Sequence, residues 1–173
     1  MPSTASYPRA SEQTALLAGG RGVRTSVVRL PQVHDSVKQG FVSFLIAVAR
    51  DKGASAYVGE GNNRWSAAHR IDVARLYRLA LEKAAAGNAQ VERYHAVAEE
   101  GVRIKEIAEA IGRGLKIPVV AIAPEQAMQH FGFLGGFAGL DMPASSALTQ
   151  ERLGWHPSGP SLLADLEAMN FNA

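Results

Sequence analysis

Residues 25–36 read TSVVRLPQVHDS, and this stretch decides the fold. Residues 25–30 are rich in β-branched side chains and nearly uninterrupted by polar ones, which predicts a strand buried on both faces of a parallel sheet. Proline has no backbone N–H to donate, so the strand should end at residue 31, and residues 31–36 should form a loop. Open α/β sheets bind ligands beyond the carboxyl ends of their strands. The loop therefore offers candidate ligand contacts, with an ordinary strand-exit loop as the equal alternative: Pro31, Gln32, Val33 and His34.

The rest of the chain alternates between strand and helix patterns. Short apolar runs predict strands at residues 54–58, 64–68, 93–98 and 118–123. Helical patterns cover residues 11–17, 41–50, 71–86, 102–115, 125–131, 145–152 and 161–169. In the clearest of these helices one apolar stripe contains Ile104, Ile107, Ala108, Ile111 and Leu115. Strands that alternate with helices predict an α/β fold with a parallel sheet.

The composition fits one globular unit. Of the 173 residues, 47% are hydrophobic and 20% are charged, which is enough apolar material to bury a core. We expect residues 1–10 to form a loosely ordered N-terminus and residues 11–173 to form a single α/β domain. Eighteen basic residues against 16 acidic ones give a net charge of +2, which argues against a nucleic-acid or membrane partner.

The residue types that are missing exclude several kinds of site. Without cysteine, the chain has no disulfide, zinc–thiolate site, iron–sulfur cluster or thiol nucleophile. No two histidines are spaced four residues apart beside a carboxylate, so we expect no metal site. The sequence also has neither an apolar run of about 18 to 20 residues nor a signal-peptide pattern, and the expected location is the cytoplasm.

The sequence carries no recognisable nucleotide-binding loop. The run Gly19-Gly20-Arg21-Gly22 follows an expected helix and precedes an expected strand. A dinucleotide loop needs the reverse order, because the pyrophosphate is held by the amides at the start of a helix. We therefore interpret this run as the end of a helix.

Four segments follow one another as in a known family. They are VVRLPQVHD (27–35), VGEGNNRWSAAHRIDVARLYRLALE (58–82), YHAVAEEGVRIKEIAEAIG (94–112) and LGWHPSGPSLLADLE (153–167). Their order and spacing resemble the carboxyl-terminal half of extended or atypical short-chain dehydrogenase/reductases, the NAD-dependent epimerase/dehydratase-like group. The resemblance extends from Ser11 to about Glu167, and the family's glycine-rich cofactor loop has no counterpart. It implies a partial Rossmann-like parallel sheet with a substrate-binding lobe, the nucleotide-binding first half being missing.

The resemblance also implies roles for particular residues. It places Pro31, Gln32, Val33 and His34 beside the nicotinamide and the substrate of a complete, NAD- or NADP-binding member. It places Arg64, Trp65 and His69 at the edge of the substrate pocket, where a guanidinium and an aromatic wall would suit a phosphate- or hydroxyl-bearing molecule. The structural alternatives are a solvated arginine, a tryptophan in the core and a histidine that caps the following helix.

The family's catalytic pair is incomplete in this sequence. The family uses a tyrosine and, four residues later, a lysine that lowers the pKa of the phenol. Counting from Tyr7 gives Ser11, and the alternative alignment on Ser11 puts Pro8 and Glu12 at the two positions. Tyr7 is thus a weak catalytic candidate, and we favour its interpretation as a tyrosine near a frayed chain end.

These observations favour the substrate-binding half of an NAD(P)-dependent oxidoreductase or epimerase-like protein that acts on a carbonyl- or hydroxyl-bearing small molecule or sugar. Alone, the chain should bind dinucleotide poorly and be inactive. Its expected partners are the small-molecule substrate and a second copy or the missing half. The alternatives are a non-catalytic binding or assembly module, to which residues 131–140, FGFLGGFAGL, could contribute a contact, and a truncated full-length enzyme.

Overall fold

The computed structural model describes residues 10–87 and 92–171, and Tyr7 lies outside these ranges. The helices are α1 (Ala10–Gly19), α2 (Val42–Lys52), α3 (Arg70–Ala85), α4 (Ile104–Leu115), α5 (Ala127–Phe131), α6 (Gly135–Ala138), α7 (Ala147–Leu153) and α8 (Leu162–Ala168). The strands are β1 (Ser26–Arg29), β2 (Gln32–His34), β3 (Ser55–Val58), β4 (Arg64–His69), β5 (Glu92–His95), β6 (Glu99–Arg103) and β7 (Val119–Ile122). Short 3₁₀ turns occupy Pro124–Gln126 and Gly132–Leu134.

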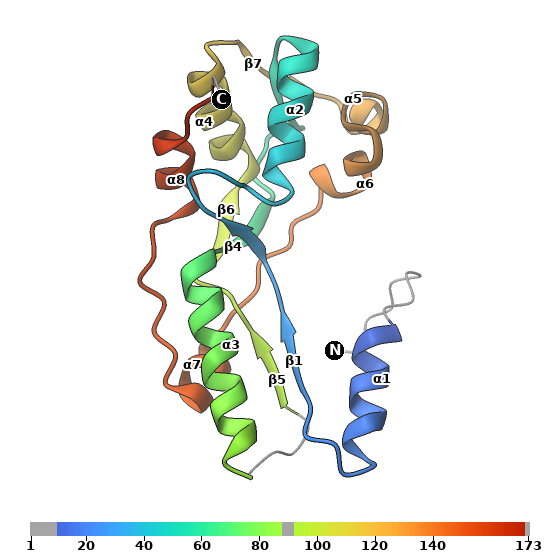
Figure 1. Ribbon diagram of the computed structural model, residues 1–173. Helices are drawn as coiled ribbons and strands as arrows, with labels where there is room; N and C mark the ends of the chain where they lie inside the picture. Colours follow the sequence, from blue (N-terminus) through green and yellow to red (C-terminus); the bar gives the residue numbers. More distant parts are fainter. Residues whose placement is uncertain (1–9, 88–91, 172–173) are drawn as a thin grey trace.

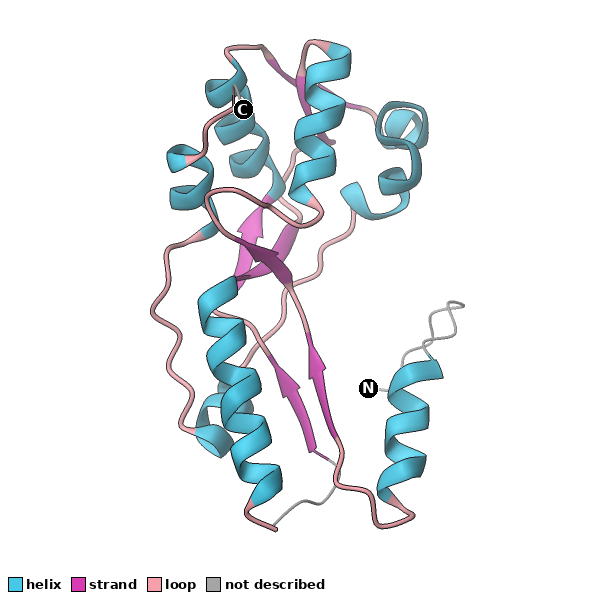
Figure 2. Ribbon diagram, viewed as in Figure 1, coloured by secondary structure: helices cyan, strands magenta, loops and turns pink. Residues whose placement is uncertain are grey.

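Parallel pairing dominates the strands, as the sequence predicts. β1 pairs in parallel with β5, β3 with β7, and β2 with β4. Only β4 and β6, among the strands described, run antiparallel. The molecule is elongated, with the three-stranded β2–β4–β6 sheet between two helical regions (Figures 1 and 2). The α/β fold is confirmed.

The prediction that residues 25–30 form a fully buried interior strand is wrong in part. β1 does pair in parallel, but its two end residues are exposed and its two central valines are only half-buried. The reason is that, within the described ranges, only β5 lies beside it. A strand with one neighbour leaves its other edge uncovered, whatever its side-chain composition.

The expected loop at residues 31–36 is a second correction. Gln32–His34 forms β2, whose register pairs Gln32 with Ala67 and His34 with His69. Pro31 lies between two strands, where its missing N–H breaks no ladder bond, and the chain passes there from one sheet to the next. The expected start of the helix at residue 102 is a further correction. Residues 102 and 103 belong to β6, which no pattern in the sequence predicted, and α4 begins at Ile104.

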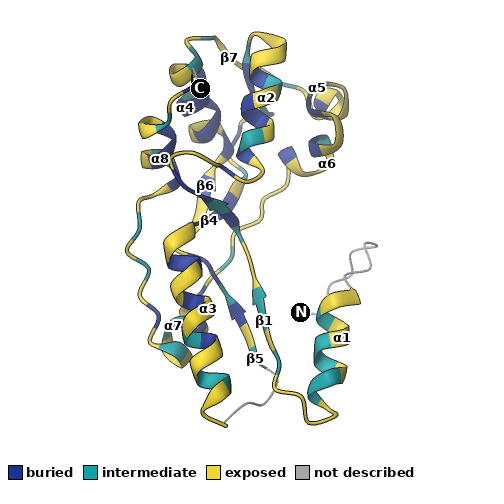
Figure 3. Cartoon of the chain, in the orientation of Figure 1, coloured by how far each residue is buried: buried dark blue, intermediate teal, exposed yellow. Residues whose placement is uncertain are grey.

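The core consists of two buried clusters that share β4. Successive side chains of a strand point to opposite faces, so Trp65 and Ala67 enter the cluster formed with α2, α4 and α8, while Ala68 enters the cluster formed with α3. The expected stripe on α4 is confirmed: Ile104, Ile107 and Ile111 are fully buried. Figure 3 shows this burial as dark blue on α4 and between the two regions.

Helix α1 stands apart from both clusters. None of its residues is buried, and it lies on the other side of the β1–β5 pair from α3 (Figures 1 and 3). Glu12 ties it to the pair through Arg29 at 2.9 Å and Arg93 at 2.8 Å. The hydrogen bond from Arg29, with that from Arg93, holds the pKa of Glu12 below its usual value, so this carboxylate is ionised rather than available as an acid.

No helix within residues 10–87 and 92–171 is long and apolar enough to cross a membrane.

Candidate functional site

A cavity of about 280 Å³ opens just beyond the carboxyl end of β1. It is lined by Leu30, Pro31, Gln32, Phe41, Trp65, Ser66, Leu134, Phe137 and Met142. Three of these residues, Pro31, Gln32 and Trp65, were singled out in the sequence, and the fold brings them together from two separate segments. The cavity therefore lies where an open α/β sheet places its ligand.

The edge of β4 explains why a cavity forms here. β2 covers this strand from Ala67 to His69, and a single parallel bridge joins Trp65 to Met142. The backbone N–H of Met142 donates to the Arg64 carbonyl at 2.7 Å. β2 and the segment that contains Met142 thus both pair with β4. Trp65 and Ser66 line the cavity next to the point where β2 begins.

Gln32 shapes one wall of the cavity. Its side-chain Oε1 accepts the backbone N–H of Phe41 at 3.0 Å, and its Nε2 donates to the Gln39 carbonyl. The turn between them needs glycine, because Gly40 has a φ of 52° and a Cβ there would lie 2.8 Å from the Val33 carbonyl oxygen. Gln32 therefore fixes the turn that holds Phe41 at the cavity.

The opposite wall comes from the hairpin of α5 and α6. This hairpin holds Leu134 and Phe137 at the cavity, and Leu134 is almost completely buried. Gly135 permits the close approach of the two short helices: a Cβ there would lie 2.5 Å from Met128 Cα and 2.6 Å from the Ala127 carbonyl oxygen. These are backbone atoms, which cannot rotate away.

We predict opposite effects for two adjacent glycines in this wall. Gly135→Ala should lower the free energy of unfolding by about 1 to 3 kcal/mol, because the helices must separate to admit the methyl group. Gly136→Ala is the matched control: it has no atom within 4 Å of the added Cβ and should be neutral or stabilising by up to about 1 kcal/mol. Urea unfolding of both variants gives the comparison, and equal midpoints would contradict it.

His34 and His69 belong to a buried polar cluster rather than to the cavity wall. His34 Nδ1 lies 2.7 Å from Asp165 Oδ2, a distance at which the ring N–H donates to the carboxylate. His34 Nε2 lies 3.8 Å from Glu99 Oε2 and has no hydrogen-bond partner among the described residues. His69 Nε2 lies 3.7 Å from Asp165 Oδ2. This cluster joins β2, β4 and β6 to α8.

The side chains of His69 and Val33 make structural contacts with α3 and its cluster. His69 caps α3, since its Nδ1 accepts the backbone N–H of Ile71 at 3.3 Å. Val33 packs against the α3 cluster. Neither residue lines the cavity.

Arg64 is paired rather than free to clamp a phosphate. Its Nε and Nη2 donate to the two carboxylate oxygens of Asp141 at 3.0 and 2.8 Å. The hydrogen bond to Asp141 raises the pKa of Arg64, and the hydrogen bond from Arg64 lowers the pKa of Asp141, so both groups stay charged. The pair fastens residues 141 and 142 to β4.

Asp72 holds the segment that follows α7. Its buried carboxylate accepts the backbone N–H groups of Ser158, at 3.1 and 3.2 Å, and of Gly159, at 2.7 Å. Its carbonyl accepts the indole N–H of Trp155 at 2.9 Å. These hydrogen bonds hold residues 155–159 against the start of α3, and the chain then continues into α8.

Several residues that matter here are not among the site candidates from the sequence. Phe41 and Met142 lie outside the four family-like segments, and Phe137 lies in residues 131–140, which the sequence suggested as an assembly contact and not as a cavity wall. Asp165 was part of a helical pattern, and only its burial reveals its role. Within the described ranges no group of three or more histidine, cysteine, aspartate or glutamate side chains could hold a metal.

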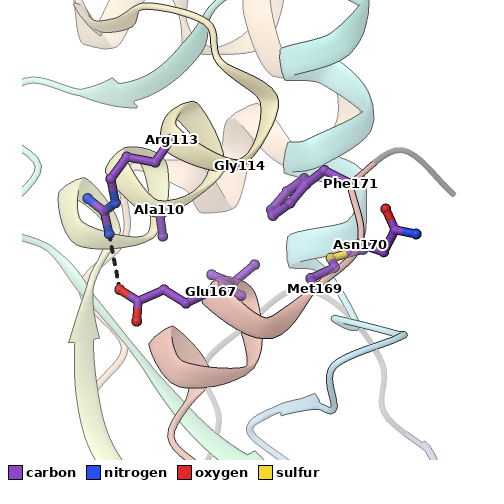
Figure 4. Close-up of a pocket in the computed structure, with 8 residues that line it drawn as sticks. Ala110, Arg113, Gly114, Glu167, Met169, Asn170 and Phe171 are labelled. Atoms are coloured by element: carbon purple, nitrogen blue, oxygen red, sulfur yellow. Dashed lines mark hydrogen bonds and ion pairs between the residues drawn. The ribbon is translucent and has the colours of Figure 1, made fainter.

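A second cavity, of about 320 Å³, lies between α4, α8 and the residues that follow α8. Figure 4 shows the side chains of Arg113 and Glu167 meeting at its side, 3.4 Å apart. Its other neighbours are largely apolar, and Phe171 packs over Gly114. None of the residues singled out in the sequence lines it, and no strand ends there.

Comparison with known proteins yields relatives and similar folds. No family model matches the chain. It is 53% identical over 156 residues to the uncharacterized protein C2A9.02 of Schizosaccharomyces pombe, covering 90% of this chain and 52% of that protein. It is 44% identical over 159 residues to the uncharacterized protein YLL056C of Saccharomyces cerevisiae, covering 91% and 52%. The chain spans about half the length of the curated relatives that it matches.

Solved structures share the architecture. The dTDP-glucose 4,6-dehydratase DesIV of Streptomyces venezuelae matches with a TM-score of 0.66 at 16% identity, covering 93% of this chain and 48% of that one. The UDP-glucose 4-epimerase of Thermus thermophilus, in complex with NAD, matches with a TM-score of 0.65 at 17% identity, covering 94% and 51%. The chain has the fold of these epimerases and dehydratases. At this identity the likeness concerns the fold alone.

These similar structures were solved with NAD, and the glycine run considered as a cofactor loop in the sequence lies after α1. The glycine run after α1 uses its amides internally: the backbone N–H groups of Gly20 and Gly22 donate to the carbonyls of Leu16 and Gly19. These amides cap the carboxyl end of α1 and do not face outward at the start of a helix. The glycine run therefore ends α1, as the sequence predicts.

Proposed function

We propose that this chain is the substrate-binding half of an NAD(P)-dependent oxidoreductase or epimerase-like protein of the extended or atypical short-chain dehydrogenase/reductase group. Its substrate would be a carbonyl- or hydroxyl-bearing small molecule or sugar. The observation that carries the proposal is the cavity beyond the carboxyl end of β1, to which the segments around Pro31 and Trp65 both contribute.

The comparisons support this proposal in two ways. The fold is that of dehydratases and epimerases solved with NAD, and the chain covers about half of each. The relatives that it matches are likewise about twice as long as the matched region. In a complete protein, the remaining half would bind NAD or NADP and supply the hydride chemistry.

The residues described here would bind and orient the substrate. Phe41, Phe137 and Met142 would contact its apolar part, and Gln32 would keep the Phe41 wall in place. The chain alone contributes no cofactor loop at its glycine run and no tyrosine–lysine pair. We therefore predict no NADH-dependent turnover by the 173-residue chain, and a measurable rate would contradict this.

A ligand screen with matched variants tests the proposal. Small carbonyl compounds, their alcohols and sugar nucleotides are added to the chain, and a binder should raise Tm by several degrees when its concentration far exceeds Kd. Phe137→Ala should abolish the shift. Phe133→Ala, which removes a ring that is 59% exposed and lies outside the cavity, should preserve it. The absence of any binder, or a binder insensitive to Phe137→Ala, would contradict the proposal.

A second candidate, an assembly module, is favoured by one observation. Phe41, Phe44 and Phe133 are all exposed, and the Phe44 ring packs against the other two, with its centroid 6.4 Å from that of Phe41 and 5.2 Å from that of Phe133. Exposed aromatic rings gathered in one place mark many protein interfaces. Light scattering of the parent and of Phe44→Ala tests this function: a dimer that the substitution dissociates would support it.

A further inference from the structure

The cavity beyond β1 has an uncharged wall. Seven of its nine lining residues are apolar, and the other two are Gln32 and Ser66. The two ends of the Gln32 amide already bond the backbone at Gln39 and Phe41. A diphosphate carries negative charges that proteins meet with arginine, lysine or helix amides, and the described lining supplies no such side chain.

The two arginines that directly precede lining residues do not change this. Arg29, which precedes Leu30, donates to Glu12 at 2.9 Å. Arg64 precedes Trp65 on β4, and its Nε and Nη2 already donate to the Asp141 carboxylate at 3.0 and 2.8 Å. Arg64 is not among the residues that line the cavity. His34 and His69 are held in the cluster around Asp165.

One polar group of the wall is open to a ligand. No hydrogen bond joins the Ser66 hydroxyl to another described residue, and Ser66 lines the cavity. The indole Nε1 of Trp65 is also unpartnered in the part of the chain that the structure describes, but this atom has almost no accessible surface and lies out of reach of the cavity. A ligand oxygen that enters the cavity can therefore bond the Ser66 hydroxyl.

The size of the cavity limits the ligand as well. Its volume of about 280 Å³ falls just below the roughly 300 to 1,000 Å³ that ligand pockets span. Aromatic and sulfur-bearing walls favour an aromatic or other apolar body, through ring and sulfur contacts.

We infer that this cavity takes a small neutral carbonyl or hydroxyl compound with an aromatic or apolar body, whose oxygen bonds Ser66, and that it rejects diphosphate-linked sugars. This inference rests on the proposed function, since it names the substrate class of the same site. It departs from MoeE5, a protein of similar fold that was solved with UDP-glucose and with UDP-glucuronic acid.

The two tryptophans of the chain provide a direct test. Their indole N–H signals are followed in a ¹H–¹⁵N correlation spectrum of the 173-residue chain, assigned with Trp65→Phe. Acetophenone should shift the Trp65 signal in a saturable way. The Trp155 signal should not move, because that indole donates to the Asp72 carbonyl, away from the cavity lining. UDP-glucose should move neither signal.

Each other outcome has a definite meaning. A saturable Trp65 shift with UDP-glucose overturns the substrate class and leaves the proposed function standing. A shift with nicotinamide but not with acetophenone also overturns the substrate class, since the cavity would then serve the cofactor. No Trp65 shift with any of the three compounds overturns the proposed function as well.

Ser66→Ala separates the hydroxyl from the apolar walls. The variant should bind acetophenone about 3- to 10-fold more weakly, the loss expected for one hydrogen bond. Ethylbenzene has the same ring but no oxygen, so its affinity should be unchanged. An equal loss for both compounds would show that the substitution disturbs the wall and would overturn the role of Ser66.

Discussion

Replacing Trp155 by alanine should lower the free energy of unfolding by about 3 to 5 kcal/mol. The side chain is 1% exposed and packs in the α3 cluster, so its removal leaves a large cavity in that core. The substitution also deprives the Asp72 carbonyl of its indole donor. For a chain of this size we expect Tm to fall by roughly 10 °C, measured by thermal unfolding followed by circular dichroism.

Two further variants separate the causes of this loss. Trp155→Phe keeps much of the buried ring but removes the N–H donor, and it should cost about 1 to 2 kcal/mol. Leu148→Ala removes a side chain that is 62% exposed on the neighbouring α7, and it should cost less than about 0.5 kcal/mol. A Trp155→Ala variant that melts within about 2 °C of the parent would show that this ring does not anchor the α3 cluster.

Replacing Asp165 by alanine should have the next largest effect, about 2 to 3 kcal/mol. The carboxylate is 4% exposed and is the partner of His34 Nδ1 at 2.7 Å. Without it, the buried His34 ring would lose the acceptor of its Nδ1–H group. Because His34 Nε2 already has no partner among the described residues, both ring nitrogens would then be unpaired. Because this contact joins α8 to β2, amide exchange should quicken most along α8.

A matched pair on the same helix makes the prediction specific. Glu167→Ala removes an exposed carboxylate whose ion pair with Arg113 is 3.4 Å long, and it should leave the unfolding midpoint nearly unchanged. Asp165→Asn keeps the volume and one oxygen acceptor, and it should recover more than half of the loss. Equal stability of Asp165→Ala and Glu167→Ala would mean that the buried cluster does not hold α8.

Local patterns were most informative where they depend on neighbours along the chain. The stripe on α4 and the left-handed Gly53 at the end of α2, with φ of 66°, follow from spacing and backbone geometry alone. They failed at β2 and β6, which are short and owe their extended form to pairing with β4. Trp155 was not evident from its neighbours either, because its contacts are with α3.

The sequence by itself determined the α/β class and most helix and strand positions, because periodicity and turn chemistry act over a few residues. The tertiary structure alone decided that Pro31, Gln32 and Trp65 line one cavity with Phe41 and Phe137, while His34 and His69 turn to Asp165. It also decided that Arg64 is neutralised by Asp141. Such contacts join residues distant in the chain, and they form only when the sheets and helices have packed.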